Sequence, residues 1–353
     1  MIGGGAWGTA LAIVAARAGR QVMLWSRRAE IAEDINRNHR NRAYLGEAEI
    51  PQAVHATTDM AAALHGAGAV LLVTPSETVR AISRTMAPLL EPGTPVILCA
   101  KGIEAGSGLL LTEVAAEELG DIPCGVLSGP TFAHEAAAGH LTAVTIASEM
   151  TPGHTAEAVA ARLAVSMGSD FFRPYVSNDV VGVEVGGAVK NVIAIACGMM
   201  TGAGYAENTR AALIARGMDE MKRLAEVLGG RRETVTGLSG AGDLTLTCSS
   251  TSSRNMSLGV QLGAGTARAD CFEGRPVVVE GERNAISVTD LARKLGVEMP
   301  IAESVRRILH DGAAIGPTFA ALWARPIEAE PQALDILIDH PAGEAALLRA
   351  AGA

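Results

Sequence analysis

A lysine in an apolar stretch is the residue of this sequence that most directly indicates chemistry. Lys190 lies within VGVEVGGAVKNVIAIACGMM, in a chain where only four of the 29 basic residues are lysine. An ammonium group without water has a lowered pKa and exchanges a proton near neutral pH, which arginine does not do. Gly186 and Gly187 leave room one turn earlier, and the polar residues nearby are Glu184 and Asn191. We therefore predict that Lys190 is a general acid/base; the alternative is a lysine at a helix edge whose amine reaches water.

The N-terminus, MIGGGAWGTA, has the glycine spacing of a dinucleotide-binding turn. Gly3 permits a tight bend, Gly5 lets the backbone approach a pyrophosphate, and Gly8 lets a helix pack closely on a strand. The following TALAIV begins a helix whose free N–H groups and partial positive charge favour phosphates. Because only Met1 and Ile2 precede the turn, the first strand is expected either to begin upstream of Met1 or to be stunted, and we favour the upstream start.

The end of the next expected strand indicates which cofactor this turn binds. Sites that prefer NAD usually carry Asp or Glu there for the ribose 2′-hydroxyl, whereas this chain has Trp25-Ser26-Arg27-Arg28. A guanidinium suits a 2′-phosphate, so Arg27 predicts NADP(H) as the preferred cofactor, with NAD(H) as the alternative. A solvated pair of arginines that caps the next helix is the competing interpretation, and it is stronger for Arg28 than for Arg27.

Two further segments carry polar groups suited to an anionic substrate. Lys101 ends the apolar run PVILCA, and the carboxyl end of a parallel strand faces the ligand crevice. The run LSGAGDLTLTC precedes SSTSSRN, in which Ser252 or Ser253 fits the N-cap of an amphipathic helix. Arg254 and Asn255 then fall in the first helical turn, where a bound anion offsets the unfavourable position of an arginine. A polar loop with an ordinary N-cap accounts for this segment equally well.

These residues need a scaffold, and the apolar pattern predicts one in two parts. Short apolar runs alternate with helical patterns over residues 1–180, which predicts an α/β dinucleotide-binding domain with a Rossmann-type doubly wound parallel sheet. Residues 181–330 show only helical patterns, so an all-helical domain for the substrate and catalytic groups is expected there, followed by a tail, 331–353, with the pattern of one more helix. The expected strands are 21–25, 69–73, 95–99, 125–127 and 143–147; the expected helices are 8–18, 29–37, 77–87, 109–119, 154–167, 182–200, 207–228, 253–263, 284–295, 302–310 and 317–324.

Composition excludes several classes of protein. The chain has 353 residues, of which 48% are hydrophobic and 19% charged, as in a globular protein of two domains. A net charge of −9 without a long basic stretch argues against a nucleic-acid partner. The five cysteines form no CxxC pair, which indicates reduced thiols in the cytoplasm, and we expect no metal site, signal peptide or membrane span.

The motifs together resemble those of the bacterial NAD(P)-dependent glycerol-3-phosphate dehydrogenases. They occur in family order over roughly residues 1–325: GGGAWGTALA, LWSRR, TPSETV, AKGIE, LSGPTFAHE, GGAVKNVIAIACGM, NTRAALIARG, GLSGAGDLTLTCSSTSSRN, VVVEG and GVEMPI. The resemblance implies an oxidoreductase that reversibly reduces dihydroxyacetone phosphate to sn-glycerol 3-phosphate, the precursor of the phospholipid backbone. It also implies a cytoplasmic homodimer.

The same resemblance implies roles for individual residues. Lys190 matches the catalytic acid/base, and Arg254 is expected to hold the substrate phosphate. The residues that match substrate contacts are Lys101, Gly129, Thr131, Lys190, Asp243, Ser253, Arg254 and Asn255. The cofactor contacts, including the glycines of the turn, are expected at Gly3, Gly5, Ala6, Trp7, Gly8, Arg27, Lys101, Ala133, Arg254, Val278 and Glu280.

Two other functions share some of these features. A two-domain dehydrogenase of hydroxy acids or sugar nucleotides shares the glycine turn and the helical second domain, but it does not require SSRN at a helix start beside GAGDLTLTC. A nucleotide-sensing protein without catalysis needs the turn but no proton donor. The presence of both Lys190 and Lys101 speaks against this second alternative.

Overall fold

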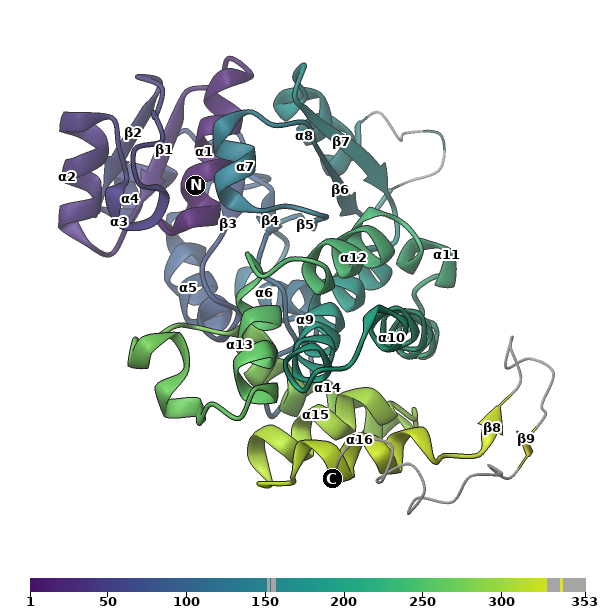
Figure 1. The fold of residues 1–353 in the computed structure, drawn as a ribbon. Coiled ribbons are helices and arrows are strands. Elements are labelled where there is room, and N and C mark those ends of the chain that lie inside the picture. The colour runs from purple at the N-terminus through teal and green to yellow at the C-terminus, as the bar shows by residue number, and fades with distance from the viewer. Residues whose placement is uncertain (151–152, 154–156, 329–336, 339–353) are drawn as a thin grey trace.

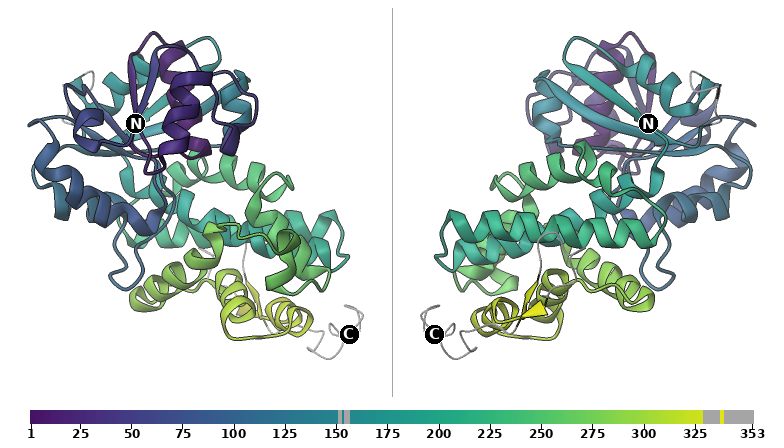
Figure 2. Two further views of the ribbon diagram at one scale, coloured as in Figure 1. Left: turned by 90° about the vertical axis from the view of Figure 1, so that its left-hand side faces the viewer. Right: turned by 90° about the vertical axis from the view of Figure 1, so that its right-hand side faces the viewer.

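The computed structural model describes residues 1–150, 153, 157–328 and 337–338, and it confirms the predicted α/β class with a helical second part (Figure 1). The sheet-containing part ends with strand β7 (Phe172–Ser177), and a run of helices begins with α9 (Val180–Gly202). The two side views show the strands up to β7 gathered at one end of the molecule and the later helices at the other (Figure 2).

The sheet is parallel over most of its width. Strand β1 pairs with β2, and β3, β4 and β5 pair in order, all in parallel register. Strand β6 is antiparallel to β5 and parallel to β7, so the sheet is mixed at this edge. The remaining strands are β1 (Val22–Trp25), β2 (Val54–Thr57), β3 (Val70–Leu72), β4 (Val96–Leu98), β5 (Cys124–Ser128) and β6 (Thr142–Ser148).

The strand expected before the glycine turn is reduced to one residue. Ile2 is buried, its N–H donates to the Leu71 carbonyl at 2.8 Å, and its carbonyl accepts from the Val73 N–H at 2.8 Å. On its other side, the Gly3 N–H donates to the Trp25 carbonyl at 3.1 Å. This single residue therefore joins β1 and β3 into one continuous array.

Alternate side chains of the central strands enter two hydrophobic cores, one on each face of the sheet. Leu71 and Ile97 pack with residues of α1, α2, α7 and α8, whereas Leu72 and Leu98 pack with residues of α4, α5 and α6. Burial on both faces explains why these strands read as continuous apolar runs. The helices of this part are α1 (Ala6–Arg17), α2 (Ala29–Asn38), α3 (Arg42–Leu45), α4 (Met60–Leu64), α5 (Val79–Met86), α6 (Leu111–Leu119), α7 (Ala133–Ala138) and α8 (Val159–Met167), with short 3₁₀ turns at Ser76–Thr78 and Ala87–Leu89.

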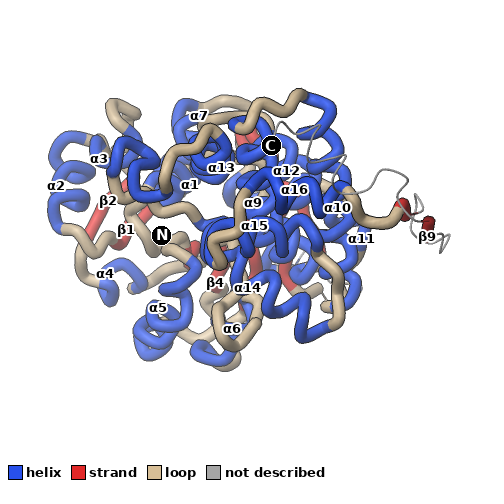
Figure 3. Tube along the Cα trace, turned by 60° about the horizontal axis from the view of Figure 1, so that its bottom comes forward, coloured by secondary structure: helices blue, strands red, loops and turns tan. Residues whose placement is uncertain are grey.

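Helix α9 is the centre of the helical part, where other helices surround it (Figure 3). It has the length and hydropathy of a membrane span, but 89% of that apolar window is buried inside the fold. The surrounding helices therefore account for its apolar faces. They are α10 (Glu207–Val227), α11 (Arg232–Val235), α12 (Asp243–Cys248), α13 (Arg254–Gly263), α14 (Glu280–Leu295), α15 (Pro300–His310) and α16 (Ile315–Trp323), with a 3₁₀ segment at Arg268–Gly274.

Helix α13 crosses α9 at very short range because glycines meet at the crossing. A Cβ atom on Gly198 would lie 2.3 Å from the Met256 carbonyl oxygen, and one on Gly259 would lie 2.3 Å from the Ile195 carbonyl oxygen. No side chain fits at either position without moving a backbone. The crossing therefore fixes the start of α13, with Arg254, relative to the lysine-bearing helix.

The sequence prediction did not include β2, β7, α3, α4, α7 or α11. Two further segments also differ from it. Residues of the polar run 238–248 are helical, because a wide π-turn (Leu238–Gly242) leads directly into α12. In the predicted tail, Leu337–Ile338 form strand β9, which pairs antiparallel with β8 (Ile327–Glu328). The other residues of the predicted tail helix lie outside the part of the chain that is described.

Candidate active site

The two unusual lysines meet at one buried carboxylate. The Lys190 Nζ lies 2.5 Å from Oδ1 of Asp243, and the Lys101 Nζ lies 2.6 Å from its Oδ2. Lys190 also donates to the Thr247 hydroxyl at 2.8 Å. Asp243 is fully buried and Lys190 is 6% exposed. These four residues, the lysine cluster, bring together α9, α12 and the segment that follows β4.

Burial gives Lys190 the property that acid/base catalysis needs. Loss of hydration lowers its pKa to about 8; the Asp243 carboxylate opposes this change and the Lys101 charge adds to it. Both the ammonium and the neutral amine are then populated near neutral pH. Two ammonium groups face one carboxylate, so with Lys190 protonated the cluster keeps a net positive charge that favours an anionic ligand.

The partners of Lys190 are not the polar residues nearest to it in sequence. The Glu184 carboxylate accepts hydrogen bonds from the N–H of Thr112, at 3.0 Å, and from the hydroxyl of the same residue, both at the start of α6. The Asn191 Nδ2 donates to Glu280 at 3.1 Å. Glu184 precedes Lys190 by six positions and Asn191 follows it by one, so both lie on other faces of the helix. This explains why neither of them is the partner of Lys190.

The two glycines before Lys190 make room for neighbouring segments. A Cβ atom on Gly187 would lie 3.2 Å from Cγ of Lys101, and one on Gly186 would lie 2.8 Å from the Ser239 carbonyl oxygen. The predicted space therefore serves the stem of the second lysine and the turn before α12. It brings Lys101 and Asp243 close to α9.

The start of α13 presents one charged group. Ser253 is its N-cap, and its Oγ accepts from the Met256 N–H at 3.2 Å. The Arg254 side chain in the first turn is 54% exposed and lies 4.0 Å from the Glu280 carboxylate. A guanidinium with this one long contact keeps donors for a phosphate.

Asn255 has a different environment from its neighbour Arg254. It is buried, its Nδ2 donates to the Asn191 side chain at 3.0 Å, and its Oδ1 accepts from the Gly281 N–H at 2.9 Å. It thus ties α13 to α9 and to the start of α14. Asn255 therefore connects three helices through its hydrogen bonds, a role that was not predicted from the sequence.

The glycine turn has the shape that a dinucleotide requires. Gly3 has a φ of +125°, and a Cβ atom on Gly8 would lie 1.9 Å from the Gly3 carbonyl oxygen. A Cβ atom on Gly5 would meet nothing within 4 Å, and no side chain caps the first turn of α1, which begins at Ala6 with Trp7 next to it. The space beside Gly5 at this helix N-terminus is therefore open and no side chain caps it, which fits a pyrophosphate.

The arginines after β1 differ in their surroundings. Arg28 bonds Glu30 at 2.6 Å and occupies the N-cap position of α2. Arg27 is exposed, and among the described residues the structure records no hydrogen bond or ion pair for its side chain. The surface interpretation thus accounts for Arg28, while Arg27 keeps its donors for a ligand.

The other predicted residues lie at the carboxyl ends of strands or at helix starts. The Gly129 carbonyl after β5 accepts from Lys101 Nζ and from the Thr131 hydroxyl, each at 3.3 Å. Ala133 begins α7, whereas Val278 and Glu280 lie just before and at the start of α14. Because β1, β4 and β5 are parallel members of one array, Arg27, Lys101 and Gly129 follow strands at the same edge of the sheet.

Sequence analysis missed two buried polar residues of the site. Thr247 follows Asp243 by four positions on one helix, and this spacing is a signal that was available in the sequence. The Asn284 Nδ2 donates to the carbonyls of Ala188, at 3.1 Å, and Lys101, at 3.4 Å. Only the packing of α14 against α9 reveals that second role. Among the described residues, no group of His, Cys, Asp and Glu side chains is arranged to hold a metal ion.

Two surface cavities lie elsewhere, between the ends of α10, α14, α15 and α16. Their volumes are about 370 and 350 Å³, and both are lined by Glu298 and Arg325. Those two side chains pair with each other at 2.7 Å. Neither cavity includes a lysine or a glycine turn, so we assign the chemistry to the lysine cluster despite the size of these hollows.

The comparisons with known proteins agree with this geometry. A family model described as the NAD-dependent glycerol-3-phosphate dehydrogenase N-terminus matches residues 1–152, and the model of the C-terminus matches residues 179–319. A glycerol-3-phosphate dehydrogenase (NAD(P)+) of Parvibaculum lavamentivorans is 48% identical over 330 residues, which cover 94% of this chain and 97% of the relative. The corresponding protein of Rhodospirillum rubrum is 47% identical, with 94% and 93% covered. The crystal structure of glycerol-3-phosphate dehydrogenase from Coxiella burnetii matches with a TM-score of 0.85 and 39% identity over 92% of this chain and 98% of that one.

Proposed function

The chain belongs to the NAD-dependent glycerol-3-phosphate dehydrogenase family, and on that premise we propose that its lysine cluster reduces dihydroxyacetone phosphate to sn-glycerol 3-phosphate. It is an enzyme of the glycerol-3-phosphate dehydrogenase (NAD(P)+) type. The observation that carries the proposed chemistry is the environment of Lys190. A buried amine with a pKa of about 8, held by Asp243, has the properties of a proton donor to a ketone oxygen.

The proposed step follows from the positions of the cluster's atoms. A nicotinamide cofactor at the glycine turn supplies the hydride when bound. As the substrate's ketone oxygen gains negative charge, the Lys190 ammonium stabilises it and donates a proton, which leaves a hydroxyl group and a neutral amine. Asp243 and Thr247 fix the ammonium at 2.5 and 2.8 Å, so the donor is oriented before substrate arrives. In the opposite direction, the neutral amine accepts the hydroxyl proton.

Arg254 is the proposed partner of the substrate phosphate. Its half-exposed guanidinium presents a planar fork of donors, and a phosphate accepts two parallel hydrogen bonds from such a fork. The N-terminus of α13 adds a partial positive charge. The expected effect of Arg254→Ala is mainly a higher KM for dihydroxyacetone phosphate, and an unchanged KM removes it from the phosphate site.

NADP(H) is the proposed preferred cofactor, with NAD(H) as the alternative. The support is Arg27, which lies at the end of β1 without a recorded ion pair among the described residues, whereas the carboxylate typical of NAD sites is absent from residues 25–28. Steady-state kinetics with NADPH and NADH test this preference. Equal kcat/KM values for the two cofactors contradict it.

The cellular role extends this chemistry. We propose that the enzyme works as a cytoplasmic homodimer and supplies sn-glycerol 3-phosphate to glycerophospholipid synthesis. Residues 1–180 hold the cofactor in this proposal, and residues 181–330 hold the substrate and the proton donor. The mass of the assembly in light scattering tests the homodimer, and a monomer contradicts it.

The decisive experiment replaces the proton donor. Lys190→Ala is expected to lower kcat for dihydroxyacetone phosphate by about 10³-fold, because general acid catalysis of this kind contributes 10²–10⁴-fold. Lys222→Ala on α10 is the matched control, since it removes an ammonium group that is only partly buried. Turnover is followed as loss of NADPH absorbance, and circular dichroism confirms that both variants fold. Near-normal turnover in the Lys190 variant ends the assignment.

A further inference from the structure

The loop that carries Lys101 is a compact hairpin. Ile103 forms an antiparallel bridge with Leu110, the Glu104 N–H donates to the Leu109 carbonyl at 3.0 Å, and the Gly108 N–H donates to the Glu104 carbonyl at 3.0 Å. We call residues 101–110 the Lys101 loop. These contacts hold residues 103–110 together, so an anchor at Glu104 also constrains the short backbone segment that leads to it from Lys101.

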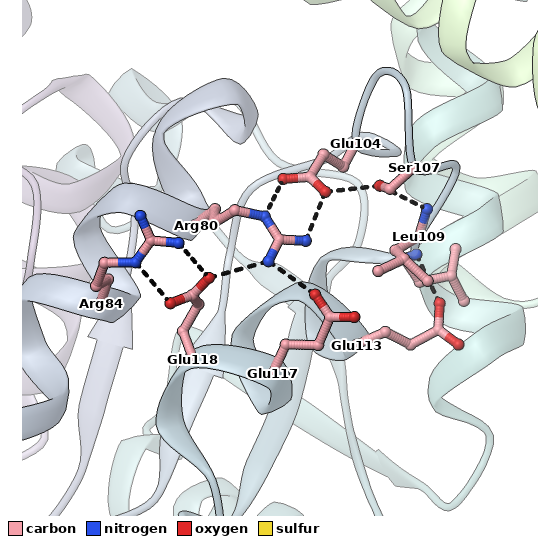
Figure 4. A network of polar contacts seen from close by, with 9 residues as sticks. Arg80, Arg84, Glu104, Ser107, Leu109, Glu113, Glu117 and Glu118 are labelled. Atoms are coloured by element: carbon pink, nitrogen blue, oxygen red, sulfur yellow. Dashed lines mark hydrogen bonds and ion pairs between the residues drawn. The ribbon is translucent and has the colours of Figure 1, made fainter.

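A two-pronged ion pair fixes this loop to α5 (Figure 4). The Arg80 Nε lies 2.8 Å from Oε1 of Glu104, and its Nη2 lies 2.7 Å from Oε2. The Ser107 hydroxyl donates to the same Oε2 at 2.6 Å. The Arg80 and Glu104 side chains are 29% and 21% exposed, so water screens the pair only in part. Two parallel charge-assisted bonds restrict orientation as well as distance.

The opposite side of the loop is tied to the catalytic helix. Asn284 is buried, and its Nδ2 donates to the Lys101 carbonyl at 3.4 Å and to the Ala188 carbonyl of α9 at 3.1 Å. Asn284 of α14 therefore links the first residue of the loop to α9, and Glu104 links the loop to α5. From the first of these attachments, the Lys101 side chain reaches Asp243.

We propose that Glu104 is a positioning residue for Lys101, through which it acts on the reaction. The inference rests on the proposed function and on the contacts with substrate and cofactor that the family resemblance implies for Lys101. The lysine side chain is a flexible chain of four methylene groups. A shift of the Lys101 backbone would therefore change the position of its ammonium group relative to Asp243. The Arg80–Glu104 fork supplies that hold, and small displacements of such a group cost large factors in rate.

A double-mutant cycle tests whether Glu104 acts through Lys101. Glu104→Gln keeps the shape of the side chain but removes its charge, and it is made in the wild type and in Lys101→Ala. We expect kcat/KM for dihydroxyacetone phosphate to fall about 10-fold in the wild-type background and less than about 2-fold in the Lys101→Ala background. The slower background is measured at a proportionally higher enzyme concentration.

Arg84→Gln is the matched control. Arg84 lies one turn after Arg80 on α5, but it bonds Glu118 of α6, and within the described part of the chain it has no hydrogen bond or ion pair with the Lys101 loop. It is expected to change kcat/KM by less than about 2-fold in both backgrounds. Arg80→Lys is the second variant, because it keeps the charge and loses the two-pronged geometry; it carries the test if Glu104→Gln fails to fold.

Equal losses from Glu104→Gln in the two backgrounds overturn the proposal, as does the absence of any loss when Lys101 is present. The dissociation constant for NADPH, from quenching of its fluorescence, is measured in the same four proteins. Failure of the proposed function appears differently, as absence of dihydroxyacetone phosphate turnover in the wild type. In that case the double-mutant cycle uses the dissociation constant for NADPH in place of kcat/KM. Equal losses in the two backgrounds, or no loss when Lys101 is present, again overturn the proposal.

Discussion

Two clusters in this molecule combine positive and negative side chains, but with different effects on their pKa values. One is the lysine cluster; the other, the arginine cluster, is formed by Arg80, Arg84, Glu104, Glu117 and Glu118. In the first, burial lowers the pKa of Lys190 to about 8. In the second, the hydrogen bonds that Arg80 donates to Glu104, Glu117 and Glu118 raise its pKa, and the arginines lower the pKa values of Glu104 and Glu118. One cluster can exchange a proton near neutral pH, whereas the other stays fully charged.

Access to water and the choice of base account for this difference. Asp243 is fully buried with Lys190, so desolvation outweighs the attraction between them. Arg84 is 68% exposed, so water reaches this pair although Glu118 is only 12% exposed, and the two charges stabilise each other. Arginine also cannot give up its proton in a protein. The surroundings of an ion pair therefore decide whether its base can exchange a proton near neutral pH or stays charged.

The largest difference between the two clusters is expected from the substitution Asp243→Asn. Loss of the carboxylate removes the group that raises the pKa of Lys190, so that pKa falls further, and it also removes the anchors of both ammonium groups. We expect kcat for reduction at pH 7 to fall about 10²-fold. Glu118→Gln in the arginine cluster is the control, with less than a 2-fold change; equal effects of the two substitutions contradict the distinction.

An intermediate effect is expected from pH alone. Reduction needs the Lys190 ammonium, which is lost as pH rises through its pKa of about 8, so kcat for reduction falls tenfold per unit above that pH. Oxidation of glycerol 3-phosphate needs the neutral amine, and its kcat rises over the same range. The dependence of kcat on pH, measured for reduction and for oxidation, tests both expectations. Because the arginine cluster does not titrate there, Arg84→Gln leaves both midpoints unchanged, and a moved midpoint contradicts this separation.

The smallest effect is expected from salt. Exposed charges are screened within about 3 Å at 1 M ionic strength, so the loss of stability caused by Arg84→Gln is small and shrinks further in 1 M NaCl. The loss caused by Asp243→Asn keeps its size, because Asp243 and Lys190 are both buried. Urea unfolding at low and high salt measures both. A salt-independent loss for Arg84→Gln indicates that this surface pair is less hydrated than its exposure implies.

The sequence predicted the central strands better than the edge strands. Strands β3, β4 and β5 are buried on both faces and appear as uninterrupted apolar runs, which are visible without a structure. Strands β2 and β7 bury only some of their residues, so VHAT and FRPYVS carry no comparable run. Similarly, Ile2 acts as a strand only because β1 and β3 lie on either side of it.

The sequence by itself determined the local features: the glycine turn, the Ser253 N-cap, and a lysine at a position where this chain otherwise has apolar residues. These depend on backbone geometry and side-chain chemistry within a few residues. Tertiary structure alone decided that Asp243 is the partner of Lys190, 53 residues away, and of Lys101, 142 residues away. Helical periodicity turns the nearer Glu184 to another face, so the choice of counter-charge depends on how α9, α12 and the Lys101 loop cross.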